Sequence, residues 1–115
     1  MFDESFEEEF DELPEVVQDE LLAQAGLLRQ FGPGLGRPRV DTLKGSRHAN
    51  MKELRFEADG GVWRVAFAFD PNRQAILLVG GDKSGSGERR FYRKLIKQAD
   101  ERFSAHLSRI DDKRR

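Results

Sequence analysis

The chain has 115 residues, with 37% hydrophobic and 36% charged residues, no cysteine and a formal net charge of -1. That length predicts one domain over residues 1–115, large enough to fold without metal or disulfide staples, and the lack of cysteine excludes disulfides and a cysteine nucleophile. The longest uncharged apolar run, residues 75–79, is too short to cross a bilayer, and the acidic N-terminus is unlike a signal peptide. We therefore expect a cytoplasmic protein with no membrane partner.

The near-zero net charge conceals a strong segregation. Residues 1–28 hold ten acids and no Lys or Arg, whereas the remaining residues carry a balance of +9. A cationic body predicts a polyanionic ligand. The alternative is a solvated acidic region packed on an ordinary basic domain.

Apolar residues recur at helical spacing over the first 31 residues. Phe2, Phe6, Phe10 and Leu13 form one stripe, and a second stripe follows Pro14, a residue that suits the first turn of a helix. Residues 1–31 therefore predict an acidic helical hairpin, or one helix kinked at the proline. The Gly- and Pro-rich residues 32–38 end it.

Three strands are expected within residues 51–82. Residues 51–56 alternate, and residues 59–61 favour a hairpin turn into residues 62–69. Residues 70–73 turn the chain again into residues 75–79, which are apolar on both faces. The prediction is an antiparallel meander.

A helix is expected over residues 88–110, because apolar residues recur there on one side. The fold class is thus α+β. Five cations crowd the first half of this helix, where the helix dipole disfavours them, which favours an anion site for phosphate. The alternative is that these side chains reach into solvent or pair with the acidic helices. They are Arg89, Arg90, Arg93, Lys94 and Lys97.

Cations and proton-transfer groups also gather around the predicted sheet. In a meander, we expect them to converge on one face and one end. Metal-free RNA cleavage needs a base for the ribose 2′-hydroxyl, cations for the phosphate and an acid for the departing 5′-oxygen. The candidates are Lys44, Arg47 and His48 before the first strand, Lys52, Glu53 and Arg55 on it, Arg64 on the second, then Lys83 and Tyr92.

Each candidate also has a structural interpretation. Arg64 could pair with Glu53, and Tyr92 could be a half-buried packing residue. His48 has no neighbours at metal-ligand spacing, so we expect no metal and no cofactor. Lys83 could be loop charge, since the glycines before it match no phosphate-binding fingerprint.

Several motifs follow one another in a characteristic order. They are residues 43–55 (LKGSRHANMKELR), 61–67 (GVWRVAF), 76–79 (ILLV), Asp82, Lys83, Phe91 and Tyr92, with Leu13, Pro14 and residues 31–33 (FGP) before them. Taken together, these motifs and the order of elements resemble the HigB-like, phage-derived branch of the RelE/ParE toxin superfamily. The similarity covers nearly the whole chain.

The resemblance implies two N-terminal helices packed on a small twisted antiparallel sheet. It also implies a toxin of a type II toxin–antitoxin module that cuts mRNA on the ribosome without a metal. The partner would be an antitoxin with a helix-turn-helix DNA-binding domain, held in a hetero-oligomer with the toxin.

The resemblance also implies roles for individual residues. Arg64 matches the strand arginine that contacts the scissile phosphate, Lys83 falls near a basic residue after the last core strand, and Tyr92 falls near the aromatic group of the last helix. Lys52 and Arg55 lie where strand cations are found. The expected RNA-binding residues are Lys44, Arg47, His48, Arg89, Arg90 and Arg93.

Two features depart from the family pattern. Glu53 stands where a lysine is common, which leaves the general base open. Family chains usually begin with a short strand, whereas residues 1–5 offer almost nothing to pair, so the sheet lacks that strand or the chain begins late. Two other functions stay open: a toxin that inhibits DNA gyrase by protein contact, and an inactive binding module.

Overall fold

Two acidic helices, a four-stranded sheet and one long helix follow each other along the chain. The computed structural model describes residues 1–85 and 87–114. Its elements are α1 (Glu4–Asp11), α2 (Glu15–Phe31), a 3₁₀ turn (Gly32–Gly34), β1 (Val40–Thr42), β2 (Lys52–Ala58), β3 (Gly61–Phe69), β4 (Ala75–Asp82) and α3 (Glu88–Arg114).

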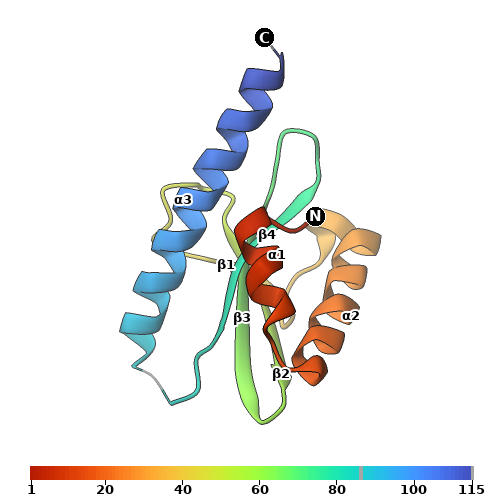
Figure 1. The fold of residues 1–115 in the computed structure, drawn as a ribbon, viewed down its shortest axis with the longest axis vertical. Coiled ribbons are helices and arrows are strands. Elements are labelled where there is room, and N and C mark those ends of the chain that lie inside the picture. The colour runs from red at the N-terminus through yellow and green to blue at the C-terminus, as the bar shows by residue number, and fades with distance from the viewer. Residues whose placement is uncertain (86, 115) are drawn as a thin grey trace.

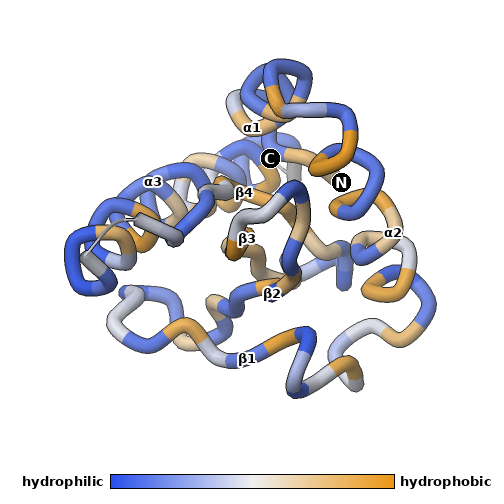
Figure 2. The backbone as a smooth tube through the Cα atoms, turned by 90° about the horizontal axis from the view of Figure 1, so that it is seen from below, coloured by the Kyte–Doolittle hydropathy of each residue, from blue (hydrophilic) through white to orange (hydrophobic). Residues whose placement is uncertain are grey.

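The sheet lies between two helical layers. Its strands are antiparallel in the order β1-β2-β3-β4, with α1 and α2 on one side and α3 on the other (Figure 1, Figure 2). Leu54, Val65 and Phe67 pack toward α1 and α2, while Ala66 and Ile76 pack toward α3. The expected α+β fold, with two N-terminal helices on a small antiparallel sheet and a C-terminal helix, is confirmed.

The β2–β3 hairpin positions the side chains that matter for chemistry. Asp59 and Gly60 have φ values of 50° and 76°, as a two-residue hairpin turn with left-handed residues requires. The resulting register pairs Arg55 with Arg64. Because side chains alternate between faces, Glu53 joins these two arginines on the α3 side of the sheet.

Some boundaries differ from the expectation. The sequence did not predict strand β1, because three residues are too few to show an alternating pattern. Its extended conformation depends on pairing with β2, where Val40 lies opposite Leu54. The strand β4 reaches Asp82 instead of residue 79, because Gly80 and Gly81 still pair with β3. The helix α3 continues beyond residue 110 to Arg114.

The expectation that the first residues have almost nothing to pair is wrong. Phe2 forms a parallel bridge with Leu77 at the outer edge of β4. The Asp3 N–H donates to the Leu77 carbonyl and the Leu77 N–H donates to the Met1 carbonyl, both at 2.9 Å. Asp3 then caps α1 by accepting from the N–H groups of the following turn. This part of the β4 edge is therefore covered.

One arginine of α3 ties the acidic N-terminus to the sheet. The Arg102 guanidinium donates to Glu9 at 2.8 and 2.6 Å and to the Leu78 carbonyl at 2.7 Å, and its Nε lies 3.9 Å from Asp3. The side chain is only 17% exposed. Replacing it leaves the buried Asp3 carboxylate and a strand carbonyl without this donor.

We expect Arg102→Ala to lower the free energy of unfolding by about 2 to 3 kcal/mol, since it removes a donor to the Leu78 carbonyl and a cation beside the buried Asp3. Urea denaturation of the two proteins measures this. Arg109→Ala is the matched control: Arg109 contacts the same Asp3 at 3.9 Å but is 51% exposed, so its loss should cost less than about 1 kcal/mol. Equal effects of the two substitutions would contradict the account.

Candidate active site

A carboxylate, a guanidinium and a phenol meet between the sheet and the first turns of α3. The Tyr92 hydroxyl donates to Glu53 Oε1 at 2.9 Å, and Arg64 Nε lies 3.2 Å from the same oxygen. Arg64 Nε also donates to the Tyr92 oxygen at 3.3 Å, and its Nη1 donates to the Trp63 carbonyl at 2.9 Å. Glu53 and Arg64 are 6% and 7% exposed. A buried arginine on a strand face is thus oriented by three neighbours.

A second arginine extends this cluster toward β1. Arg55 Nε lies 3.4 Å from Glu53 Oε1, and Arg55 Nη1 lies 3.9 Å from Asp41. Asp41 also pairs with Arg37 at 3.2 Å. Arg64 and Arg55 together present two guanidinium groups on one face, and a guanidinium fork can hold two phosphate oxygens.

The loop between β4 and α3 adds a cation. Lys83 Nζ lies 5.8 Å from the centre of the Tyr92 ring and donates to Glu88 at 3.1 Å. The Lys83 backbone N–H donates to the Val62 carbonyl at 2.8 Å, which continues the β3–β4 ladder and fixes the start of this loop. The structure therefore brings Arg64, Lys83 and Tyr92 together at one end of the sheet.

The environment of Tyr92 determines the chemistry open to it. Burial, followed by the hydrogen bond to Glu53, raises the pKa of Tyr92 above its ordinary value, against the opposing effect of Arg64. The hydroxyl therefore stays protonated at neutral pH. Tyr92 can donate a hydrogen bond or a proton, but it cannot serve as a base there.

A comparison with protein-family models identifies the family of this chain. The family model described as phage-derived protein Gp49-like matches residues 8–104. The chain belongs to the phage-derived Gp49-like family. The resemblance found from the sequence is thereby confirmed, and the two related proteins described next carry HigB names.

Two curated proteins of Mycobacterium tuberculosis (strain ATCC 25618 / H37Rv) are similar to this Gp49-like chain. A protein named as a candidate toxin, HigB2, is 48% identical over 93 residues, which cover 80% of this chain and 46% of the relative. A second, named as a candidate toxin, HigB3, is 54% identical over 82 residues, which cover 71% of this chain and 69% of the relative. The chain thus spans about half the length of the first. No solved structure matches.

The structure separates Lys52 from the other strand candidates. Lys52 pairs with Phe67 and shares its face with Leu54, which packs toward α2. Arg55 and Arg64 lie on the opposite face, toward α3. The expected convergence on one face therefore fails for Lys52, because successive residues of a strand alternate between faces.

The loop before β2 is anchored farther along α3. The Arg47 N–H donates to Asp100 at 3.1 Å, and Ser46 Oγ donates to the same carboxylate. His48 Nε2 lies 3.0 Å from Ser104 Oγ, and its ring contacts Phe103 edge-on. With a rise of about 1.5 Å per residue, these contacts lie about 12 to 18 Å along α3 from Tyr92. Arg47 and His48 therefore fix this loop and do not meet Arg64; the remaining loop cation, Lys44, is exposed.

The three expected RNA-binding arginines of α3 are exposed on its first turns. Arg89, Arg90 and Arg93 make no ion pair with α1 or α2 among the residues described. The acidic N-terminal segment pairs instead with Arg102 and Arg109. Of the two structural alternatives for these arginines, pairing with the acidic helices is not seen within residues 1–85 and 87–114, whereas their side chains do reach into solvent.

Sequence reasoning missed two acidic residues near these groups. Asp41 lies on the unexpected strand β1, and Asp100 is a 5% exposed carboxylate on α3 that receives the loop before β2. The only signal for Asp100 was an acid next to the apolar stripe of α3. Within the described residues, no three acidic, His or Cys side chains are grouped to hold a metal ion, and no helix is both long and apolar enough to cross a membrane.

The ionisation of Tyr92 can be measured directly, because it is the only tyrosine of the chain. An absorbance titration of the phenolate should give a pKa above that of free tyrosine, and Glu53→Gln should lower it, because a neutral amide no longer opposes the phenolate charge. An apparent pKa at or below that of free tyrosine would show that the Tyr92–Glu53 contact does not persist in solution.

Proposed function

We propose that this protein is the toxin of a type II toxin–antitoxin module and that it is an endoribonuclease that cuts mRNA on the ribosome in the cytoplasm. The observation that carries the proposal is Arg64, a buried arginine held between Glu53 and Tyr92 with Lys83 beside them. The names of the two related proteins support the toxin part of the proposal.

The proposed reaction needs only side chains of this site. The ribose 2′-oxygen attacks the adjacent phosphorus and gives its proton to Glu53, the carboxylate at the centre of the cluster. Arg64 and Arg55 bind the phosphate oxygens as negative charge grows on them. The P–O5′ bond breaks, and the departing 5′-oxygen takes a proton from Lys83 or Tyr92. The products are a 2′,3′-cyclic phosphate and a 5′-hydroxyl.

The exposed cations of α3 extend this site along the nucleic acid. Arg89, Arg90 and Arg93 lie on the helix turns next to Tyr92, so they can contact phosphates on either side of the cut. Such contacts set affinity and carry no sequence information. Lys44 is exposed and can add to this surface. The Arg47 backbone and the His48 ring are engaged with α3, but the Arg47 side chain is 63% exposed and can still contact a phosphate.

The proposed partner is an antitoxin with a helix-turn-helix DNA-binding domain, in a hetero-oligomer with this chain. Its role would be to keep the free toxin from ribosomes. The toxin names of the two relatives support an antitoxin partner. Its helix-turn-helix domain and the hetero-oligomer are what the family resemblance implies.

One observation favours a second candidate, an inactive binding module. Glu53 contacts both arginines and Tyr92 through one oxygen, so the groups that would bind phosphate already hold a carboxylate. In that case the cluster stabilises the packing of α3 on the sheet and does no chemistry.

The chemistry of the cut ends tests the proposal. Purified protein is mixed with ribosomes that hold a defined mRNA, and the fragments are mapped. The proposal expects 5′-hydroxyl ends and cyclic phosphates, formed equally well in the presence of a chelator of divalent ions added after the complexes are fixed. Intact mRNA under these conditions would favour the binding module, and 5′-phosphate ends would reject the proposed reaction.

A further inference from the structure

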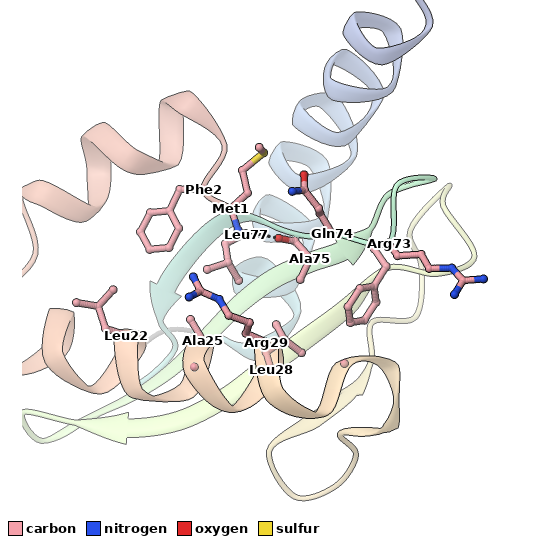
Figure 3. Close-up of a pocket in the computed structure, with 13 residues that line it drawn as sticks. Met1, Phe2, Leu22, Ala25, Leu28, Arg29, Arg73, Gln74, Ala75 and Leu77 are labelled. Atoms are coloured by element: carbon pink, nitrogen blue, oxygen red, sulfur yellow. Dashed lines mark hydrogen bonds between the residues drawn. The ribbon is translucent and has the colours of Figure 1, made fainter. Parts of the chain in front are cut away.

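A groove of about 680 Å³ lies on the side of the sheet away from Arg64, between α2, the first residues and the β3–β4 hairpin (Figure 3). Most of the residues that line it are apolar, and one of these residues, Leu22, is 52% exposed. An apolar hollow with exposed walls is typical of a protein-binding surface. The apolar lining includes Phe2, Leu22, Ala25, Leu28, Phe69 and Leu77.

Positive charges line this apolar groove: Arg29, Arg73 and Met1, whose ammonium donates to the Ala75 carbonyl at 3.0 Å. Figure 3 shows the Arg29 side chain extending from α2 toward Leu77, between the helix and the sheet. Arg29 forms no ion pair and no side-chain hydrogen bond with any residue that the structure describes. A guanidinium that faces apolar walls without an acid gains most from a carboxylate brought by another molecule.

The groove contains open space beside a glycine of α2. Gly26 lines it in the interior of α2, and a side chain added at this position would meet no atom within 4 Å. Glycine in a helix interior lowers helix stability, so this position carries a local cost while it leaves the groove open.

We propose that this groove binds a segment of a partner protein that presents apolar side chains next to a carboxylate. The apolar side chains fill the hollow between α2 and β4, and the carboxylate pairs with Arg29. The inference goes beyond the proposed nuclease function, because the groove and the Arg64 cluster lie on opposite faces of the sheet and neither requires the other.

Peptide selection on the full chain tests this inference. Random peptides of about 12 residues are displayed and selected for binding to the wild-type protein. We expect the enriched sequences to combine apolar residues with Asp or Glu. A Gly26→Trp variant, in which the indole fills the groove, should lose at least about tenfold in affinity for them, and so should Arg29→Glu.

Two matched variants serve as controls. Arg29→Lys keeps the charge but loses the guanidinium fork, so its affinity should lie between those of the wild type and of Arg29→Glu. Gly26→Ala is too small to cross the groove, so it should bind like wild type while it raises the melting temperature. If Gly26→Trp fails to fold, the affinities of Arg29→Glu and Arg29→Lys for the selected peptides still test whether the peptides bind in the groove.

Three results would overturn the inference. Enriched peptides could be basic or lack apolar residues, which contradicts the proposed chemistry. Selected peptides could bind all the groove variants equally, which places their site elsewhere. Wild-type protein could form a dimer that Arg29→Glu or Gly26→Trp dissociates, which assigns the groove to a second copy of this chain.

Discussion

Cleavage of ribosome-bound mRNA is expected to fall by about 10²- to 10³-fold when Arg64 is replaced by Ala, because the transition state loses a preorganised cation in a nearly water-free site. Arg64 is 7% exposed and its orientation is fixed by contacts to Glu53, Tyr92 and the Trp63 carbonyl, so a phosphate that binds it has to replace part of its contact with Glu53. Single-turnover cleavage rates at saturating protein measure the effect. The cleavage rate of Arg64→Lys should lie between those of the wild type and of Arg64→Ala, since lysine keeps the positive charge but lacks the guanidinium fork.

The matched control is Arg29→Ala, which removes an arginine from the other side of the sheet and should cleave like wild type. Thermal melting must accompany each rate, because Arg64 also pairs with the buried Glu53. Tyr92 and Arg55 still contact that carboxylate in the variant, so we expect a folded protein. A folded Arg64→Ala variant with a wild-type rate would remove Arg64 from the reaction.

Replacing Glu53 by Gln is expected to separate binding from cleavage. The amide keeps the shape of the side chain but cannot accept a proton, so the cleavage rate should fall by about 10²-fold or more. Affinity for RNA should rise, because Arg64 and Arg55 no longer share their charge with a carboxylate 3.2 and 3.4 Å away. Anisotropy with a short RNA whose reactive 2′-oxygen is methylated measures the affinity without cleavage.

The two readouts distinguish three roles for Glu53. Tighter binding with slower cleavage supports the proposed base. Tighter binding with faster cleavage would mean that Glu53 only occupies the phosphate site and that another group takes the proton. No change in either readout would contradict both roles and leave Glu53 as a packing residue.

The parts of the fold that local sequence determines were predictable. The β2–β3 turn was expected because Asp59 and Gly60 tolerate positive φ, and once this turn is set the register of the hairpin follows. The strand β1 and the pairing of the first residues with Leu77 were not predictable, since each depends on a distant partner and involves too few residues for a pattern.

The candidate site divides in the same way. Arg64 and its pairing with Glu53 followed from the register of one hairpin, and the second interpretation of Arg64 given by the sequence, a salt bridge, is present in the structure. The path of the loop before β2 depends on Asp100, more than 50 residues away, so the sequence could not show that Arg47 would be held there. Lys52 was grouped with Arg64 although strand alternation separates them.

The nuclease function is tested in the cell by a map of mRNA 5′ ends in bacteria after brief induction of the wild-type protein and of Arg64→Ala at equal levels. We expect new internal 5′ ends within translated regions for the wild type, and their loss in the variant. Growth arrest without new ends would contradict the nuclease function and favour inhibition of gyrase. No arrest at all would leave a binding module.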